Sequence, residues 1–440
     1  MPVDRAAAQE PAEKTTGRWH TALRVTAVVG ISLAVAGLYQ LSTPHDFFDL
    51  KIYMKALRWW ADGNPLYDYV QPDAVQGLLY FTYPPVTALL LRPFVGLPLS
   101  ATIVIFTALS MVAVAVTTWW LLTRTQLVAS VAGRPWARPS GNAGGPRAPA
   151  WFVAGVAVPL VFAAESIRET LTFGQINMLL VVLILADLLF AVPGKSRWAG
   201  MGVGLATALK LYPGIFLVYL LVARRWRAAA MAAAAAVAAT ALAAAVAPQD
   251  SWRFWTHELW ATGRVGRTDY TGNQSLLGLL SRLSAPDDPN RLLWLALVVA
   301  VTGYGLWRAA QAARAGDELA GLALSGLVGA LASPITWPHH VYWFIPAVLV
   351  LVDAGLRHRP LLLTLAVVTY AGAVYGVVSF YDWGIAPVPT DSPVEFVLRN
   401  LSVLLALLLL VVLPVRRPAP APTRFGTTLH RRPGAPAGSG

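Results

Sequence analysis

Two aspartates, Asp46 and Asp49, are the side chains in this sequence best suited to acid–base chemistry. A carboxylate can remove the proton from a hydroxyl as that hydroxyl becomes a nucleophile, so one base is sufficient for group transfer to an alcohol. Glycoside hydrolysis usually needs two carboxylates, and the spacing of this pair is compatible with that. We expect Asp49 to be a single catalytic base and Asp46 to contact substrate. The alternative for Asp49 is a cap at a helix N-terminus.

Four cations near the ends of apolar stretches suit an anionic leaving group. A phosphate or diphosphate needs positive partners, and arginine can bind it through two parallel hydrogen bonds. The alternative for each cation is anchoring at a membrane interface. Lys210 is the most unusual, because it interrupts an apolar stretch just before Tyr212 and Pro213. The four candidates are Arg168, Lys210, Arg264 and Arg267.

Adjacent histidines, His339 and His340, follow Pro334 and Pro338 at a predicted helix start. We expect one of them to contact a phosphate or a sugar, with a structural hydrogen bond as the alternative. Neighbouring helical side chains point in different directions, so this pair alone makes a poor metal site. Four amides suit sugar hydroxyls because an amide both donates and accepts, although such groups also join membrane helices: Gln175, Asn177, Asn273 and Gln274.

A short amphipathic helix must position Asp49. Ile52, Tyr53, Ala56 and Leu57 recur at intervals of three and four residues, which is the period of one helical face. The segment 62–65, Asp-Gly-Asn-Pro, predicts the end of this helix, because glycine and asparagine tolerate a left-handed turn and proline cannot extend a helix. We therefore predict a helix on the membrane surface with Asp49 in its first turn.

The composition predicts an all-α polytopic membrane protein. The 440 residues are 56% hydrophobic and 13% charged, which is too apolar for a soluble domain. Apolar stretches near the roughly 20 residues that cross a bilayer recur along the chain, and we expect ten to thirteen transmembrane helices. The net charge of +12 comes largely from Arg/Lys clusters between these stretches. That pattern orients membrane spans and requires no nucleic-acid partner.

We divide the chain into a cytoplasmic tail (1–20), a transmembrane catalytic domain (21–414) and a second tail (415–440), both tails being disordered. Two long polar loops, 42–83 and 248–290, are expected on the outer side. The first apolar stretch, 21–41, is expected to be a retained helix rather than a signal peptide. A further interruption, Glu165–Glu169, divides another apolar stretch, and Lys210–Pro213 breaks a helix between 198 and 222.

The Arg-bearing linker 123–150 leaves the topology open. Its charge favours the cytoplasmic side. However, if the apolar piece 84–94 were a full span, the linker would lie outside.

Several motifs together resemble glycosyltransferase family 87, the actinobacterial polyprenyl-phosphomannose-dependent α-mannosyltransferases with the GT-C fold. They are Asp49–Tyr53, Ala61–Asp68, Phe81–Pro85, Phe173–Asn177, Lys210–Pro213, Asn273–Ser275 and Ser333–His340. They run in the family's order along most of the chain. One departure is Pro338, where the family more often has a polar residue, and this leaves open which histidine faces the site.

The resemblance implies a multi-pass plasma-membrane enzyme with its site on the extracytoplasmic side. The donor would be polyprenyl-phosphate-mannose, and Asp49 would be the base of an inverting transfer that forms an α-linkage. The acceptor would be a cell-envelope glycolipid: a phosphatidylinositol mannoside, lipomannan or lipoarabinomannan. We expect no required cofactor, since no Gly-rich nucleotide loop is found. A divalent metal at the phosphate is compatible with the chemistry but is not indicated.

Two alternatives stay open at this point. One is an arabinofuranosyl (pentosyl) transferase that uses the same kind of lipid donor. The other, from a different class, is a lipid or sugar transporter.

Overall fold

The computed structural model describes residues 10–42, 45–74, 77–128, 148–356, 359–376, 381 and 389–416. Within these residues the regular secondary structure is helical apart from one antiparallel hairpin, in which β1 (Val70–Asp73) pairs with β2 (Gly77–Tyr80). The long helices are α1 (Glu10–Leu41), α4 (Leu99–Leu122), α10 (Trp226–Val246) and α13 (Arg291–Arg314).

Shorter helices complete the structure. Those of mainly apolar sequence are α3 (Pro85–Leu91), α5 (Ala150–Ala163), α7 (Asn177–Ala186), α8 (Met201–Leu209), α9 (Gly214–Val222), α14 (Glu318–Ala332), α15 (Phe344–Gly355), α16 (Pro360–Tyr375) and α18 (Leu401–Val412). The others are α2 (Phe48–Ala61), α6 (Glu165–Phe173), α11 (Pro248–Thr256), α12 (Leu276–Ser284), α17 (Pro393–Arg399), the 3-10 turns η1 (Leu66–Asp68), η2 (Arg92–Gly96), η6 (Glu258–Trp260), η7 (Thr262–Arg264) and η8 (Pro338–His340), and the π-helical turn η5 (Asp187–Ala191).

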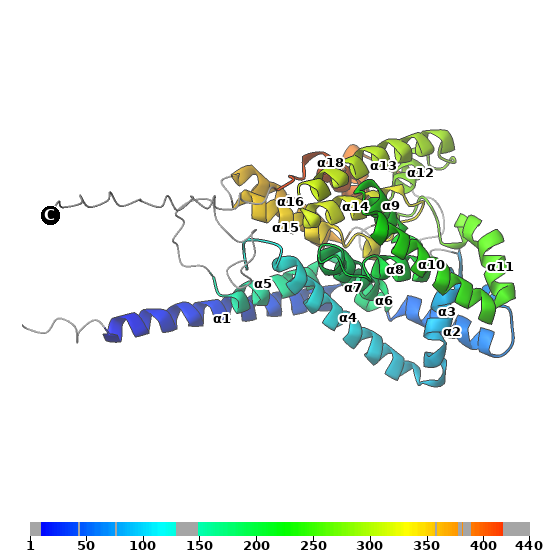
Figure 1. Ribbon diagram of the computed structural model, residues 1–440, viewed down its shortest axis with the longest axis horizontal. Helices are drawn as coiled ribbons and strands as arrows, with labels where there is room; N and C mark the ends of the chain where they lie inside the picture. The colour runs from blue at the N-terminus through cyan, green and yellow to red at the C-terminus, as the bar shows by residue number, and fades with distance from the viewer. Residues whose placement is uncertain are drawn as a thin grey trace, which may run out of the picture.

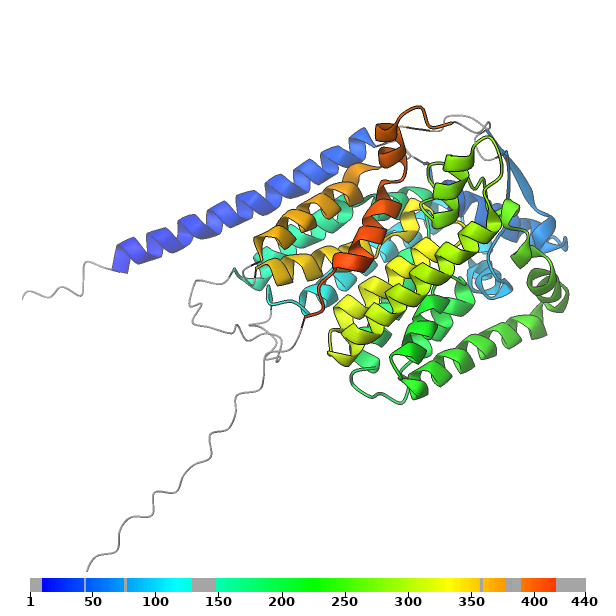
Figure 2. The ribbon, with the colours of Figure 1, turned by 90° about the horizontal axis from the view of Figure 1, so that it is seen from above.

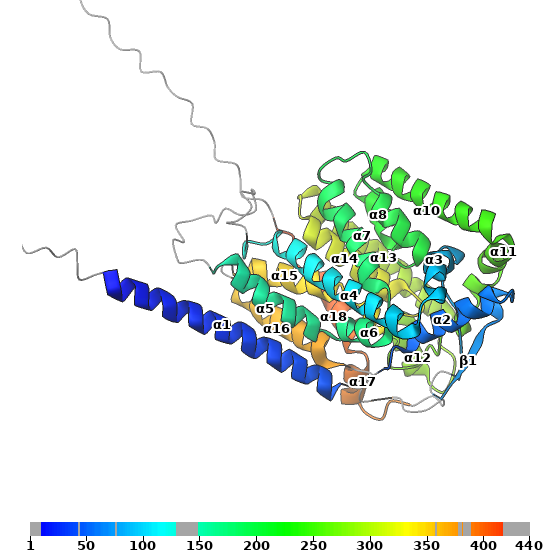
Figure 3. The ribbon, with the colours of Figure 1, turned by 90° about the horizontal axis from the view of Figure 1, so that it is seen from below.

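The apolar helices lie side by side in one bundle, with α2, the hairpin and α11 gathered at one end of it (Figures 1 and 2). The first residues of α1 lie at the opposite end, as the view from below also shows (Figure 3). Helix α14 is buried along nearly its whole length, and it contacts α13, α15, α18 and α9. It is the core helix around which the others pack.

Four described helices are long and apolar enough to cross a membrane. Two bent pairs, α5 with α6 and α17 with α18, give six candidate spans if each pair is counted as one span. Five further apolar helices in the described residues are shorter, with 10–17 residues. The predicted count of ten to thirteen transmembrane helices stays a prediction. Large apolar side chains on the outside of the long helices, such as Leu33, Val104 and Val237, are exposed. Such exposure is costly in water but normal against lipid. The chain is an all-α polytopic membrane protein.

The alanine-rich helix α10 packs closely on α8, as its composition predicts. A Cβ atom at Gly204 of α8 would lie 2.2 Å from the carbonyl oxygen of Ala232 on α10. The two helix backbones therefore approach each other closely, which small residues at a helix interface permit in membrane proteins.

Several predicted boundaries change. Helix α1 begins at Glu10, so residues 10–20, expected to be disordered, are helical; residues 1–9 lie outside the described residues, as do 129–147 and 417–440. The segment 42–83 contains a hairpin in addition to the predicted helix α2, and the segment 248–290, expected to be a loop, contains α11 and α12. Helices of nine residues are shorter than the stretch over which helical periodicity is read from a sequence, so α11 and α12 are difficult to distinguish from loops.

The piece at 84–94 is not a full span, because it consists of the seven-residue helix α3 followed by the turn η2. Helix α4 then crosses the bundle, and Gln126 just beyond its end donates to the backbone carbonyl of Asp353, 2.7 Å away, near the end of α15. The described start of the 123–150 linker thus lies at the end of the bundle opposite α2 (Figure 3).

Candidate active site

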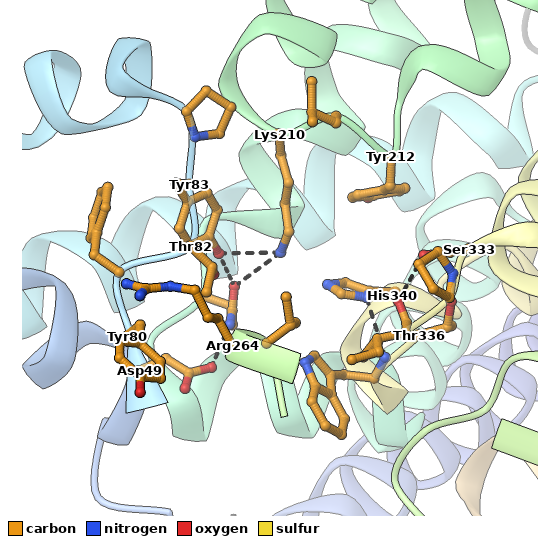
Figure 4. Close-up of a pocket in the computed structure, with 18 of the residues that line it drawn as sticks. Asp49, Tyr80, Thr82, Tyr83, Lys210, Tyr212, Arg264, Ser333, Thr336 and His340 are labelled. Carbon is orange, nitrogen blue, oxygen red and sulfur yellow. Dashed lines mark hydrogen bonds between the residues drawn. The ribbon is translucent and has the colours of Figure 1, made fainter. Parts of the chain in front are cut away.

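A cavity of about 310 Å³ opens where the two long polar segments, 42–83 and 248–290, meet the interrupted helices. Its walls come from the start of α2, the segment after β2, the junction of α6 and α7, the break between α8 and α9, η7, and the loop that follows α14. The side chains drawn in Figure 4 converge on it from all of these elements. The residues that line the cavity include Asp49, Tyr83, Gln175, Lys210, Arg264, His339 and His340.

The chain enters α2 through two residues in the left-handed region, Asp46 (φ 49°) and Phe47 (φ 54°). This backbone conformation is unfavourable for residues other than glycine, and it persists only where contacts with the surrounding structure stabilise it. Here the Phe47 N–H donates to the carbonyl of Thr172 at 2.8 Å, which connects the start of α2 to α6. As predicted, Asp49 lies in the first turn of α2, and the helix ends before Asp62.

A close contact between α2 and the end of α6 places Gln175 beside Asp49. Helix α6 ends at Gly174, which has a φ of 71°, and a Cβ atom there would lie 2.7 Å from the Cβ of Leu50. Only glycine satisfies both the left-handed turn and this approach. Gln175 follows directly, and its Nε2 donates to Oδ2 of Asp49.

A polar network continues from Gln175 across the cavity wall. The Tyr83 hydroxyl donates to Oε1 of Gln175 at 2.8 Å and pairs with the Tyr53 hydroxyl at 2.8 Å. Because Oε1 accepts from Tyr83, the amide nitrogen is directed at Asp49. No described side chain donates to the other carboxylate oxygen, Oδ1, which remains for a ligand.

Lys210 lies at the centre of the network, in the predicted break between α8 and α9. Its ammonium donates to the Tyr83 hydroxyl at 3.1 Å, to Oδ1 of Asn177 at 2.9 Å and to Oε1 of Gln175 at 3.5 Å. Asn177 in turn donates to the carbonyl of His339 at 3.2 Å. The break in the helix thus turns a buried cation toward the cavity, two hydrogen bonds from Asp49 (Figure 4).

Burial raises the pKa of Asp49 from 3.8 to about 6, while the Gln175 hydrogen bond and the charge of Lys210 act in the opposite direction. A base is most effective when its pKa lies near the working pH, because it is then ionised and still basic. Asp49 is therefore both deprotonated near neutral pH and a stronger base than an exposed aspartate.

The two histidines line the cavity as neutral rings. Burial lowers the pKa of both well below the usual value, and the charge of Lys210 adds to the effect. His340 Nδ1 accepts from the Trp337 N–H at 3.2 Å, so its proton lies on Nε2, which has no partner among the described residues. Neither ring nitrogen of His339 has a partner among them either. Each histidine can therefore offer a hydrogen bond to a ligand.

Arg264 closes another wall of the cavity. Its guanidinium lies 3.8 Å from the ring centroid of Tyr80, pairs with Glu258 at 2.7 Å and donates to the carbonyl of Tyr67 at 2.6 Å. These contacts hold the guanidinium in place and leave its charge beside the cavity.

Six of the predicted site residues are not among the side chains that line the cavity. One of them, Asn177, still contacts the ammonium of Lys210. Arg168 donates to the carbonyls of Ala163 and Val374, and Arg267 pairs with Asp269. Asp46 is exposed and paired with Lys51. For these three, the substrate contact that we expected has no support in the geometry. A cation near a span end was also compatible with anchoring, and Arg168 serves to join α5 to α16.

Asn273 and Gln274 bind the backbone instead of facing the cavity. The amide of Asn273 receives the Thr336 N–H at 2.9 Å and donates to the carbonyl of Pro334 at 3.1 Å. Gln274 donates to the carbonyl of Arg399 at 2.8 Å. Both are fully buried. The side chain of Asn273 holds the loop Ser333–His340, named here the histidine loop, from behind, whereas that of Gln274 holds the end of α17.

Tyrosines are the residues that sequence reasoning missed. Tyr83 bonds Gln175 and Lys210, Tyr212 stacks on His340 with ring centroids 5.2 Å apart, and Tyr80 carries Arg264. All three stand in or beside motifs noted in the sequence, but tyrosines at a membrane interface are so common that their type carries no signal. Among the described residues, no three His, Asp or Glu side chains gather in a group able to hold a metal ion.

Comparisons of the sequence with known proteins find a matching family model and several relatives. Residues 81–334 match the family model of glycosyltransferase family 87. The chain is 34% identical, over 74% of each protein, to a polyprenol-phosphate-mannose-dependent alpha-(1-2)-phosphatidylinositol mannoside mannosyltransferase of Mycobacterium tuberculosis. A pentamannoside mannosyltransferase of Mycolicibacterium smegmatis is 30% identical over 76% of this chain and 75% of its own length. An alpha-(1->3)-arabinofuranosyltransferase of M. tuberculosis is also 30% identical, but over 60% of this chain and 54% of its own. No solved structure matches the chain.

Proposed function

Because the chain belongs to glycosyltransferase family 87, we propose that it transfers mannose from polyprenyl-phosphate-mannose to a phosphatidylinositol mannoside or related envelope glycolipid. The observation that carries the proposal is the half-buried carboxylate of Asp49, held by Gln175 and facing a cavity that also contains Lys210 and Arg264. A base and cations around one cavity are what transfer from a lipid phosphate to a hydroxyl requires.

Asp49 begins the reaction. Its Oδ1 accepts the proton of an acceptor hydroxyl while that oxygen bonds to C1 of mannose. The bond between C1 and the phosphate oxygen breaks, and its electron pair leaves with polyprenyl phosphate. Attack on the face opposite the leaving phosphate inverts the configuration, so a β-linked donor yields an α-mannoside. The proton on Asp49 then returns to solvent.

Lys210, Arg264 and the histidines bind the phosphate as its negative charge grows. The ammonium of Lys210 reaches the cavity from the break in the helix, and the guanidinium of Arg264, paired with Glu258, reaches it from η7. The N–H groups of neutral His339 and His340 donate without adding charge. Fixed donors of this kind stabilise a developing anion at little reorganisation cost, because they are already held in position.

The site faces the extracytoplasmic side of the plasma membrane in this proposal. Helix α14 begins at Glu318, beside Arg225, and ends at the loop that lines the cavity. Arg416 pairs with Asp317 at that same first end of α14. Basic residues favour the cytoplasmic side of a membrane protein, so the other end of α14, with the cavity, points outward.

The test uses the purified protein in nanodiscs with labelled polyprenyl-phosphate-mannose and a mixture of phosphatidylinositol mannosides. We expect labelled mannose in the glycolipid fraction, α-linked by mass spectrometry and enzymatic digestion. Polyprenyl-phosphate-arabinose, offered in parallel, tests the pentosyltransferase suggested by the partial arabinofuranosyltransferase match. Transfer of arabinose without mannose would overturn the assignment of the donor. Movement of labelled lipid across vesicles with no transfer of either sugar would favour a transporter.

A further inference from the structure

Asp49 and His339 line a second cavity as well as the first. This cavity has a volume of about 280 Å³. Its other walls come from the residues before α2, from β1 and β2, from α6 and from the turn before His339. This volume is just below the roughly 300 Å³ at which small-molecule sites usually begin, so the cavity suits a small ligand such as one sugar ring.

The two cavities differ in charge. The first contains Lys210 and Arg264, and its remaining acid besides Asp49, Glu258, pairs with arginines. The second is lined by the carboxylates of Asp49, Asp73 and Glu169, and none of its described lining residues is lysine or arginine. Like charges in a confined site repel, so a phosphate is favoured in the first cavity and disfavoured in the second.

The second cavity also has side chains suited to an uncharged sugar. Glu169 pairs through Oε1 with Nε2 of His45 at 3.1 Å, and the His45 ring stacks on Phe173 with centroids 3.9 Å apart. Carboxylate oxygens accept bonds from sugar hydroxyls, and a carboxylate has room for more than one. Trp337 and Tyr270 add aromatic faces on which the apolar side of a sugar ring can lie.

We infer that this second cavity, named here the His45–Glu169 subsite, binds the acceptor's terminal sugar and selects an uncharged ring over a phosphorylated one. The inference rests on the proposed function for the identity of the acceptor. It places the acceptor hydroxyl on one side of Asp49 and the donor phosphate on the other. The single carboxylate can then deprotonate the hydroxyl while the sugar–phosphate bond lies on the far side of C1.

The test measures binding without donor, so that it does not depend on turnover. The protein in nanodiscs is titrated with methyl α-dimannoside and with the same compound phosphorylated at the 6-position of its terminal ring. We expect the neutral compound to bind and the phosphorylated one to bind at least about tenfold more weakly, since one unfavourable charged contact outweighs a typical hydrogen bond. Equal binding of the two compounds, or preference for the phosphate, would overturn the inference.

Two variants assign the binding to the subsite. Glu169→Gln removes the charge and should bring the two affinities closer, while weakening the neutral compound about tenfold. His45→Phe keeps a ring against Phe173 and removes the nitrogen that pairs with Glu169, so it should weaken the neutral compound without loss of folding. Asp62→Asn, an exposed acid outside both cavities, is the matched control. Unchanged binding in both variants, with thermal unfolding like that of the parent, would place the sugar elsewhere.

Different experimental results would contradict the subsite and the proposed function. If the parent protein transfers mannose but the dimannoside binds independently of His45 and Glu169, the subsite is wrong and the function stands. If the dimannoside binds as expected but no mannose is transferred, the subsite stands as a sugar site and the assigned reaction is wrong.

Discussion

Asp49→Asn is expected to abolish mannose transfer and at the same time to stabilise the protein. Asparagine has nearly the shape of aspartate, and its oxygen can still accept the hydrogen bond from Gln175. The substitution therefore removes the charge and the basicity with little change in packing. A carboxylate that served only to cap α2 would show the opposite effect on stability.

The size of the stability effect follows from the pKa of Asp49, which burial raises from 3.8 to about 6. The folded state holds this proton more tightly than the unfolded state, so wild-type stability falls as the pH rises from about 4 to about 6. At about 1.4 kcal/mol per pKa unit, the ionised carboxylate costs at most about 3 kcal/mol at pH 7. Partial exposure to cavity water makes this an upper limit. Asp49→Asn removes the cost at pH 7 and changes nothing near pH 4.

Two measurements on the same preparations test this prediction. Thermal unfolding in detergent at pH 4 and pH 7 should show a higher midpoint for Asp49→Asn at pH 7 only. Transfer should fall at least about a hundredfold, the usual contribution of a general base. Wild-type kcat/KM should rise with pH and level off above about 6. Asp62→Asn is the control, because this exposed acid lies outside both cavities. Transfer within tenfold of wild type, or a variant less stable than wild type at pH 7, would refute the reasoning.

Other substitutions test the network and the far end of the bundle. Lys210→Met should lower kcat/KM for the donor about tenfold to a hundredfold, because a charge-assisted contact to the phosphate is lost; a donor titration with unchanged kinetics would contradict its role. Tyr83→Phe leaves Gln175 without one of its donors and should cost about 1–3 kcal/mol, measured by thermal unfolding, with a smaller loss of transfer than Asp49→Asn. Arg416→Met leaves Asp317 buried without its arginine partner and should cost about 3–5 kcal/mol while the donor KM stays unchanged. A raised donor KM with unchanged unfolding in that last variant would argue against a structural role.

Local sequence patterns predicted much of the scaffold. The helical period around Tyr53 and the turn at Asp62–Pro65 identified α2 and placed Asp49 in its first turn. The polar interruption at Glu165 and the break at Lys210 were also found where the structure has them. These features depend on residues within a few positions of one another, which is the range over which helical periodicity and turn propensity act.

What the tertiary structure decided is which of the candidate side chains meet. Gln175 lies 126 residues from Asp49 in sequence, and Lys210 lies 127 from Tyr83, yet each pair is in contact. Arg168, a cation, and Asn273, an amide, were candidates for the same chemical reasons as Lys210 and Gln175. The packing of α5, α16 and the histidine loop instead turned them to backbone carbonyls. Composition and periodicity determined that helices form and cross a membrane. The contacts across the cavity arise from how those helices pack, because a buried polar side chain takes whichever partner the surrounding backbone presents to it.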